Sequence, residues 1–384
     1  MGFLITLFII SSLYYLCATL FLYSGLKRIS LLPVKAHPRS LTFSVIIAAH
    51  NEETNIGPCL ESVLAQTIDH DRFEVIVVND RSTDRTAAIA GQIARTHAEL
   101  TVCSITKTPA GWSPKKYAVS RGIACSRNEI IVFTDADCLV PALWLETIDG
   151  FFDANVGLVQ GITTYCSVNG LNKIFFGMQA LDFLSHGVVA AAAIGARFPL
   201  NSNANNMAFR KKAFDDVGGY GDVGGVVSGD DDLLVQRIWK SGAWHIRYMA
   251  DAKGSVQTYP ALTVSALFEQ RKRWGSKTVH YNRMQTFFLA GIFCFYCSCT
   301  VGIVGALFVP KLWLAAAGMI MVKCIGEAAL LIPGTALFNK RDLRPYILPA
   351  SLVQLPLVLA AVFTGVFGKF GWKGQTFKRT VKPQ

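Results

Sequence analysis

Two aspartates directly after a buried strand are the residues of this chain best placed to do chemistry. Residues 130–134 are apolar or β-branched and predict a strand, and Asp135 and Asp137 follow it. Ligands bind at the carboxyl ends of strands in open α/β sheets, where a charge is costly unless it is paired or metal-bound. Two such carboxylates favour a hard cation that shares a phosphate, as Mg²⁺ or Mn²⁺ does. The alternative is an Asp-rich turn without a metal.

Two other predicted strands end in polar loops of the same kind. Residues 43–49 lead into Asn51 and Glu52, and residues 73–78 lead into Asp80. Strands that alternate with helices predict a mostly parallel sheet with right-handed crossovers. Residues 43–137, which hold these strands, contain neither a G-x-G-x-x-G nor a G-x-x-x-x-G-K-[ST] motif, which weakens the hypotheses of a dinucleotide oxidoreductase and a P-loop enzyme. The remaining predicted elements here are a strand at 100–105 and a helix at 115–125.

A run of three aspartates, Asp230 to Asp232, opens a further predicted helix. Acidic residues are favourable at a helix N-terminus, so capping is one explanation. Three in succession exceed what a cap needs, which favours a chemical role.

A basic and aromatic motif lies near the middle of a predicted amphipathic helix at 262–280. Gln270, Arg273 and Trp274 stand there in the arrangement Gln-x-x-Arg-Trp. The alternative to a catalytic role is a basic helix that is attracted to anionic lipid.

The composition indicates one globular domain with membrane segments. The chain has 384 residues, of which 52% are hydrophobic, ten cysteines and a net charge of +11. The cysteines lack the spacing of a disulfide framework and are expected to be reduced, as in the cytosol. Residues 3–26 are almost wholly apolar, and Lys27 and Arg28 follow them, which predicts an uncleaved anchor with the next domain in the cytoplasm. Three more apolar stretches lie at about 286–309, 312–333 and 345–368.

Charged residues inside two apolar stretches indicate how those stretches are placed. Residues 174–193 contain Asp182 and His186, so we expect an interfacial or buried helix there. Lys323 and Glu327 stand four residues apart and are expected to pair.

The last apolar stretch, 345–368, has two possible topologies. The basic residues after it prefer the cytoplasm, and a third crossing after residue 280 would place them outside. Because Pro349 and Pro356 interrupt the stretch, it either crosses as a helix or enters and returns on one side.

Together these motifs resemble the family 2 glycosyltransferases with a GT-A catalytic fold, in their membrane-anchored form. The likeness covers about residues 40–280, and it rests on the order and spacing of motifs that are each weak alone. It implies an α/β, mostly parallel catalytic domain with transmembrane helices at both ends, similar to ceramide glucosyltransferases and bacterial carotenoid glycosyltransferases. The motifs are Ala49-His50-Asn51-Glu52-Glu53, Asn79-Asp80-Arg81-Ser82-Thr83-Asp84, Lys115 before Ala118, Thr134-Asp135-Ala136-Asp137, Ser228-Gly229-Asp230-Asp231-Asp232 and Gln270-x-x-Arg273-Trp274. The expected parts are an anchor at 1–27, the GT-A domain at 40–260, an interfacial helix at 261–283, a transmembrane region at 284–368 and a basic tail at 369–384.

The resemblance implies roles for the matching residues. Asp135 and Asp137 would bind Mg²⁺ or Mn²⁺ together with the nucleotide. The base motif of the family usually reads Glu-Asp, and here Gly229-Asp230 stands in its place. We align Asp230 with the catalytic base, with Asp231 as the alternative. The other implied roles are nucleoside binding for Ala49, Asn51, Glu52 and Asp80, contact with the donor diphosphate for Lys115 and Arg273, and contact with the acceptor for Trp274 in the motif begun by Gln270.

The function that follows is inverting transfer of a sugar from a nucleotide-sugar, expected to be UDP-linked, to a hydroxyl of a membrane lipid. A metal and an Arg stabilise charge on the leaving phosphate, and a carboxylate accepts the proton of the attacking hydroxyl. The alternatives are a processive polysaccharide synthase of the same family and a non-catalytic membrane protein that binds nucleotides. The expected location is a bacterial inner membrane, with the catalytic domain in the cytoplasm and no nucleic-acid partner.

Overall fold

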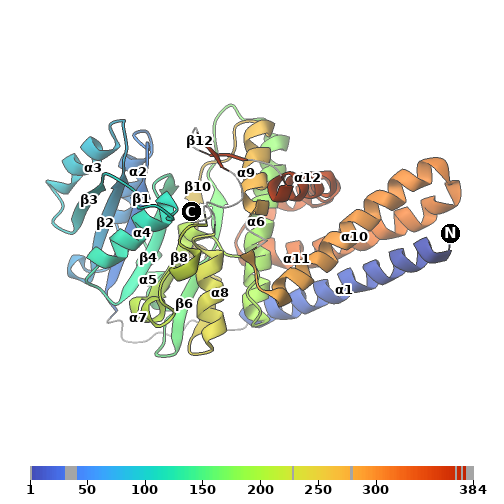
Figure 1. Cartoon of the computed structure of the whole chain (residues 1–384), viewed down its shortest axis with the longest axis horizontal. Helices are drawn as coiled ribbons and strands as arrows, with labels where there is room; N and C mark the ends of the chain where they lie inside the picture. The colour runs from blue at the N-terminus through green and yellow to red at the C-terminus, as the bar shows by residue number, and fades with distance from the viewer. Residues whose placement is uncertain are drawn as a thin grey trace. The chain divides into compact units, whose positions relative to one another are not determined.

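The computed structural model describes residues 2–30, 41–226, 229–276, 280–367, 370–372 and 375–377. The chain divides into two compact units, which we describe separately and name the sheet unit and the helical unit (Figure 1). Of the described residues, the sheet unit comprises 41–169, 201–226 and 229–260, and the helical unit comprises 2–30, 170–200, 261–276, 280–367, 370–372 and 375–377.

A seven-stranded sheet forms the centre of the sheet unit, in the order β3-β2-β1-β4-β8-β6-β9. The pairs β2–β3, β1–β2, β1–β4 and β6–β9 are parallel, and β8 runs antiparallel to both of its neighbours. The predicted α/β class with a mostly parallel sheet is therefore confirmed. The strands are β1 Phe43–Ala49, β2 Phe73–Asp80, β3 Leu100–Ile105, β4 Ile130–Asp135, β6 Val156–Gly161, β8 Met207–Arg210 and β9 His245–Met249. A smaller sheet joins β5 Cys138–Leu139, β10 Val256–Thr258 and β7 Thr163–Tyr165.

Helices bury both faces of the large sheet, which explains why its central strands are continuous apolar runs. Val45 and Ile47 of β1 pack in the cluster that contains α2, and Ile46 packs in the cluster that contains α4. α4 lies very close to the sheet, since a Cβ on Gly122 would stand 2.5 Å from Cγ2 of Ile46. The helices are α2 Ile56–Leu64, α3 Thr86–Ala94, α4 Pro114–Cys125, α5 Trp144–Asp149, α7 Lys211–Asp216 and α8 Asp232–Ser241.

Among its described residues, the helical unit contains five helices that are long and apolar enough to cross a membrane, by length and composition. These candidates span Gly2–Ser30, Lys173–Gly195, Arg283–Phe308, Pro310–Leu337 and Arg341–Gly365. In Figure 1, α1, α10 and α11 run alongside one another, whereas α12 is seen nearly end-on and α6 and α9 run across the bundle. The helices are α1 Gly2–Ser30, α6 Lys173–Gly195, α9 Val264–Ser276, α10 Arg283–Phe308, α11 Trp313–Leu337 and α12 Ile347–Phe367, and the strands β11 Phe370–Trp372 and β12 Gln375–Phe377 form a hairpin.

The order of strands in the sheet restricts what α6 can do. β8 follows α6 in the chain, yet it pairs with β4 and β6, which both precede α6. A single complete crossing by α6 would separate β8 from its sheet partners. α6 must therefore begin and end on the same side of any membrane, as an interfacial or buried helix does. It packs against α1, where a Cβ on Gly195 would stand 2.1 Å from the carbonyl oxygen of Gly25.

α12 is a single continuous helix from Ile347 to Phe367, with Pro356 inside it. The irregular backbone that a re-entrant loop would need is absent from this range. Its C-terminal part packs closely on α9, since a Cβ on Gly365 would stand 2.5 Å from the carbonyl oxygen of Lys272. Most of the predicted tail at 369–384 lies outside the described residues.

Candidate active site

Lys115 joins two of the predicted site carboxylates in the sheet unit. It lies in the first turn of α4, Asp135 ends β4, and Asp230 precedes α8. The Lys115 Nζ atom lies 2.8 Å from Asp135 Oδ1 and 3.1 Å from Asp230 Oδ2. Burial lowers the pKa of Lys115, but the two carboxylates outweigh it and raise that pKa above its ordinary value. The structure thus brings together three residues that are far apart in the sequence.

Asp137 lies next to this cluster in an environment that disfavours its charge. Burial, together with the carboxylates of Asp135 and Glu52, raises the pKa of Asp137 to about 6. A divalent cation relieves such repulsion, so this donor set fits Mg²⁺ or Mn²⁺. Among the described residues, no three His, Cys, Asp or Glu side chains form a metal-holding group.

The three consecutive aspartates do different things. Asp231 accepts hydrogen bonds from the backbone N–H groups of Asp232, at 2.7 Å, and Ala204, at 3.0 Å. Asp232 accepts one from the N–H of Ser202. Both side chains therefore fix the start of α8 and the adjacent loop. Asp230 faces Lys115 instead: burial raises the pKa of Asp230, but Lys115 and Lys116 outweigh it and hold that pKa below its usual range.

The loops after β1 and β2 are joined by side chain–backbone hydrogen bonds. The Oδ1 of Asn51 accepts from the N–H of Thr83 at 2.9 Å, and the N–H of Glu52 donates to Oγ1 of Thr86 at 2.8 Å. Asn51 and Arg81 have φ angles of 53° and 56°, a left-handed conformation that non-glycine residues rarely adopt. These loops stand at the carboxyl ends of the strands, where Ala48 is paired with Asp135.

Two predicted nucleoside contacts have specific surroundings in this structure. Asp80 is held by the guanidinium of Arg81, whose Nε lies 2.7 Å from Asp80 Oδ1. Ala49 is fully buried at the end of β1, so its backbone is the part that remains for a ligand.

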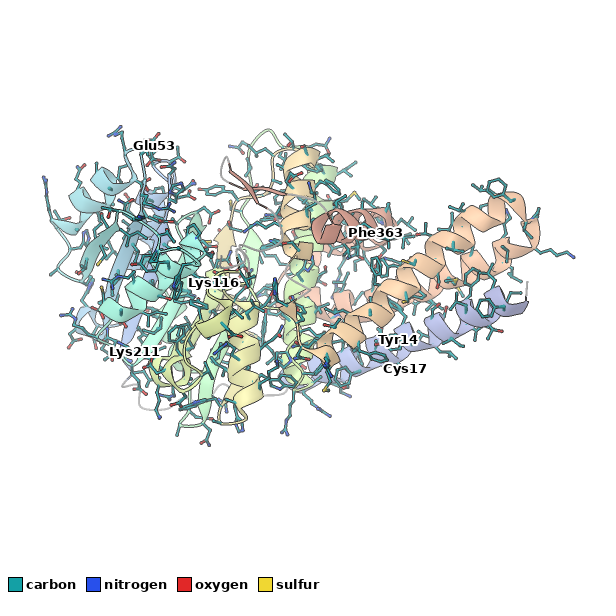
Figure 2. All side chains as sticks on the ribbon, in the orientation of Figure 1. Tyr14, Cys17, Glu53, Lys116, Lys211 and Phe363 are labelled. Atoms are coloured by element: carbon teal, nitrogen blue, oxygen red, sulfur yellow. The ribbon has the colours of Figure 1, made fainter. Side chains whose placement is uncertain are left out.

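Sequence reasoning missed Lys116, the neighbour of Lys115 (Figure 2). Its side chain is fully buried, and its Nζ donates to the carbonyl oxygens of Val223 at 2.9 Å and Val226 at 2.8 Å. It thereby fixes the Gly-rich segment 218–226, which precedes the three aspartates. Tyr220 in that segment was also missed: its buried hydroxyl has no hydrogen-bond partner among the described residues. Burial, with Asp230 nearby, raises the pKa of Tyr220.

The Gln-x-x-Arg-Trp residues belong to α9 of the helical unit. Gln270 Oε1 accepts a hydrogen bond from Arg271 at 2.7 Å, and the guanidinium carbon of Arg271 lies 4.2 Å from the centre of the Trp274 ring. The Trp274 ring also contacts His186 of α6, with ring centres 5.2 Å apart. Contact of Arg273 and Trp274 with a donor and an acceptor stays a prediction.

Comparison with known families identifies the class of the protein. Residues 44–183 match the family described as Glycosyl transferase family 2. Residues 130–331, more than half of the chain, match the family described as Glycosyl transferase family group 2. The chain belongs to the family 2 glycosyltransferases, as the motifs had implied.

Individual relatives are distant. The glycosyltransferase AglE of Haloferax volcanii is 27% identical over 277 residues, which are 70% of this chain and 81% of AglE. The beta-monoglucosyldiacylglycerol synthase of Synechocystis is 27% identical over 243 residues, 60% of this chain and 46% of that enzyme. The 4,4'-diaponeurosporenoate glycosyltransferase of Staphylococcus aureus is 37% identical over 94 residues, 24% of this chain and 23% of the relative. The chain thus matches about half or less of the length of several relatives.

A solved structure shares the fold. The mannosyltransferase PcManGT from Pyrobaculum calidifontis superposes with a TM-score of 0.61 at 20% identity, covering 95% of this chain and 99% of that one. At this identity the likeness shows the fold, and it confirms the predicted GT-A class.

Proposed function

We propose that this protein transfers a sugar from a nucleoside diphosphate donor to a hydroxyl of a membrane lipid, with inversion at the sugar. The observation that carries the proposal is the convergence of Lys115 on Asp135 and Asp230 at the carboxyl end of β4. The lysine lies between two acids, and the neighbouring Asp137 has a raised pKa. Such a group is suited to binding a cation and a diphosphate. Two of the relatives are named for a monoglucosyldiacylglycerol and a diaponeurosporenoate, which supports a lipid acceptor.

Each residue has a part in this reaction. Asp135 and Asp137 would hold Mg²⁺ or Mn²⁺, which supplies stabilisation of the charge on the leaving diphosphate. The similar mannosyltransferase structure is a complex with GDP-Man and Mn²⁺, whereas the donor expected from the motifs of this chain is UDP-linked. Lys115 would face the same diphosphate.

Asp230 is the residue we assign as the base that accepts the proton of the acceptor hydroxyl. The low pKa of Asp230 keeps it ionised and able to accept a proton. Asp231 is less suited, because both of its oxygens already accept backbone N–H groups. Arg273 and Trp274 remain assigned to the diphosphate and the acceptor.

The membrane arrangement follows from charge. Lys27 and Arg28 stand in the last turn of α1, and Lys340, Arg341 and Arg344 follow α11, which favours the cytoplasm for both positions. Crossings by α1, α10 and α11 satisfy both preferences and keep the sheet unit in the cytoplasm, as in a bacterial inner membrane.

Purified protein in detergent, supplied with labelled UDP- and GDP-sugars, Mn²⁺ and bacterial lipid extract, tests this function. A labelled lipid one hexose heavier than its acceptor, formed with Mn²⁺ and lost in excess EDTA, is the expected product. Products with a broad range of sugar numbers would instead indicate the processive synthase. Absence of both sugar transfer and donor hydrolysis with every donor would contradict the proposal.

A further inference from the structure

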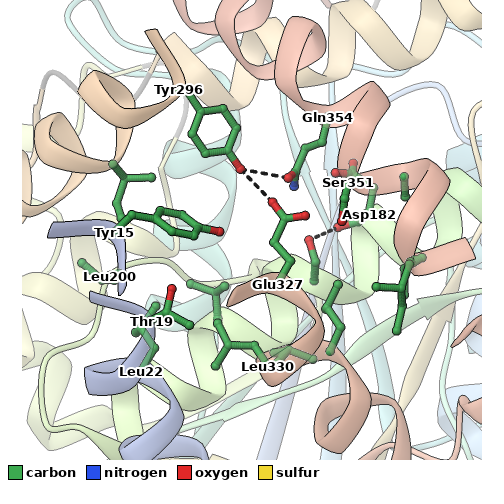
Figure 3. A pocket seen from close by; sticks show the side chains of 18 of the residues that line it. Tyr15, Thr19, Leu22, Asp182, Leu200, Tyr296, Glu327, Leu330, Ser351 and Gln354 are labelled. Atoms are coloured by element: carbon green, nitrogen blue, oxygen red, sulfur yellow. Dashed lines mark hydrogen bonds between the residues drawn. The ribbon is translucent and has the colours of Figure 1, made fainter. Parts of the chain in front are cut away.

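A cavity of about 180 Å³ lies inside the helical unit, between α1, α6, α10, α11 and α12 (Figure 3). Most of its wall is apolar, and side chains such as Leu22, Val188 and Leu330 supply it. A single water needs about 10–15 Å³ of such space, so this cavity has room for part of a larger molecule. Apolar pockets with a few convergent polar groups are the usual form of a ligand site.

The polar groups of the cavity gather around Glu327 and Tyr296. The hydroxyl of Tyr296 lies 3.0 Å from Oε1 of Glu327 and 3.0 Å from Oε1 of Gln354, as the dashed lines in Figure 3 show. Behind them lies Lys323, which is fully buried and does not line the cavity. Lys323 donates to Glu327, to the carbonyl oxygen of Ser351 at 2.7 Å and to Gln354 at 3.3 Å. An ammonium group has three donors, so these three acceptors saturate it.

Ser351 supplies the observation that points to a ligand. It lines the cavity, is 3% exposed, and its hydroxyl has no hydrogen-bond partner among the described residues. A buried polar atom without a partner destabilises the fold, and native proteins leave few of them. A hydroxyl of a bound molecule would be such a partner.

The charged side chains that line the cavity indicate which kind of ligand it can bind. Asp182 and Glu327 both line it, and both are acids. The cations that pair with them, Arg271 and Lys323, do not line it. A phosphate head group would therefore meet carboxylates, whereas a neutral hydroxyl can donate to Glu327 and accept from Ser351.

We propose that this cavity binds the hydroxyl end of a neutral, long-chain lipid. Resting on the proposed function, this assigns the cavity as a site where the acceptor lipid is held, with its apolar chain against the helices, before its hydroxyl reaches Asp230. The proposal excludes phosphorylated lipids as preferred occupants.

Photolabelling of the full chain in detergent tests the site. The probe is hexadecanol that carries a diazirine on its chain, and the competitors are unlabelled hexadecanol and hexadecyl phosphate. The expected result is labelling of cavity-lining residues near Leu330, with competition by the alcohol at least ten-fold stronger than competition by the phosphate. Equal or stronger competition by hexadecyl phosphate, or labelling confined to residues outside the cavity, would overturn the proposal.

Two neighbouring positions on α11 give a matched pair of variants. Leu331 lines the cavity and is 7% exposed, whereas Ile332 does not line it and is 47% exposed. Leu331→Phe fills the cavity and should reduce labelling at least five-fold, while Ile332→Phe should leave it unchanged. Ser351→Ala, which adds no bulk, should reduce labelling several-fold without lowering thermal stability. Equal labelling of all three variants and the wild type would reject the site even if Leu331→Phe folded poorly.

Hydrolysis of the nucleotide-sugar in water separates this proposal from the proposed function. Loss of labelling in Leu331→Phe and Ser351→Ala with unchanged donor hydrolysis supports the cavity as a lipid site. A wild-type chain that binds the alcohol in the cavity but neither hydrolyses nor transfers any sugar would overturn the function and still support the site.

Discussion

Two lysines, one in each unit, pair with carboxylates and yet are in different environments. Lys115 lies between Asp135 and Asp230, and its side chain is 20% exposed while that of Asp135 is 34% exposed. Lys323 is fully buried, and a carboxylate, an amide and a carbonyl oxygen saturate it.

This difference shows what separates a binding cluster from a structural one. The partners of Lys115 are two charged groups at the solvent-accessible end of a strand, and a diphosphate can exchange with them. The partners of Lys323 include backbone and leave no donor free. We therefore expect changes around Lys115 to alter activity first, and changes at Lys323 to alter stability first.

Asp137→Asn should have the largest effect on activity. We expect transfer to fall on the order of 10⁴-fold, because metal stabilisation is worth several kcal/mol and each 1.36 kcal/mol is a factor of ten. The folded state raises the pKa of Asp137, so charging this group above that pKa costs stability, and a neutral amide removes the cost. The variant should thus be at least as stable as the wild type at pH 7. Turnover assays and thermal unfolding check both expectations.

The control for this variant is Asp222→Asn, since the side chain of Asp222 is 83% exposed and pairs with Arg237. It should keep full activity. Wild-type rates in excess EDTA would disprove the metal role of the Asp135–Asp137 pair.

Asp230→Asn should follow, with transfer about 10²–10⁴-fold slower, as is typical when a general base is lost. Donor binding, measured by calorimetry with UDP and Mn²⁺, should persist. Asp231→Asn is the matched variant next to it and should be milder, with its main effect on stability through the N–H groups of Ala204 and Asp232. A greater loss of turnover in Asp231→Asn would move the base by one residue.

The comparison of the two lysines gives a third prediction. Lys115→Met should reduce transfer about 10²-fold, the effect of removing one charge-stabilising donor. Its stability should change by no more than about 1 kcal/mol, because partly exposed ion pairs contribute little. Lys323→Met should lower the free energy of unfolding by about 3–5 kcal/mol, since it removes the cation that pairs with the largely buried carboxylate of Glu327. Thermal and denaturant unfolding in detergent measure the difference.

A double variant tests the reason for that loss. Adding Glu327→Gln to Lys323→Met removes the unpaired charge, so stability should recover in large part. If Lys115→Met proved the more unfolded of the two single variants, the contrast between the lysines would be wrong.

Local patterns in the sequence predicted the parts of the fold that depend on local burial. β1 and β3 have the predicted bounds. β1 is covered on both faces, and such strands are continuous apolar runs. The strand-end argument predicted Asp135, and the four-residue spacing predicted the pair of Lys323 and Glu327, which the structure confirms.

Those local patterns could not predict long-range contacts. β8 is four residues long and becomes a strand by pairing with β4 and β6 on its two sides. α6 was assigned to the catalytic domain by its place in the chain, yet it groups with the helical unit because small residues let it approach α1. Lys116 looks like Lys115 in sequence, and only the folded loop shows that it binds carbonyl oxygens.

The prediction with the smallest expected effect on activity concerns the course of the chain through the membrane, which single cysteine substitutions test. α9 precedes α10 and α11 in the chain and α12 follows them, yet α9 and α12 pack together: a Cβ on Gly275 would stand 3.2 Å from the carbonyl oxygen of Ala361. This contact, and the orientation of α12 across the bundle in Figure 1, favour an α12 that stays on the side of α9.

A helix that stays on one side also removes the conflict with the positive-inside rule. With α1, α10 and α11 as the crossings, Lys311 is the one charged residue at 309–312, in the expected outer connection. We predict that a cysteine at Lys311, in a background without the native cysteines, is labelled from outside intact cells by an impermeant maleimide. A cysteine at Gln384 should be protected until the membrane is permeabilised, and neither substitution should alter transfer. Ready labelling at Gln384 in intact cells would mean that α12 crosses, because only a further crossing would bring the basic residues after it to the outer face.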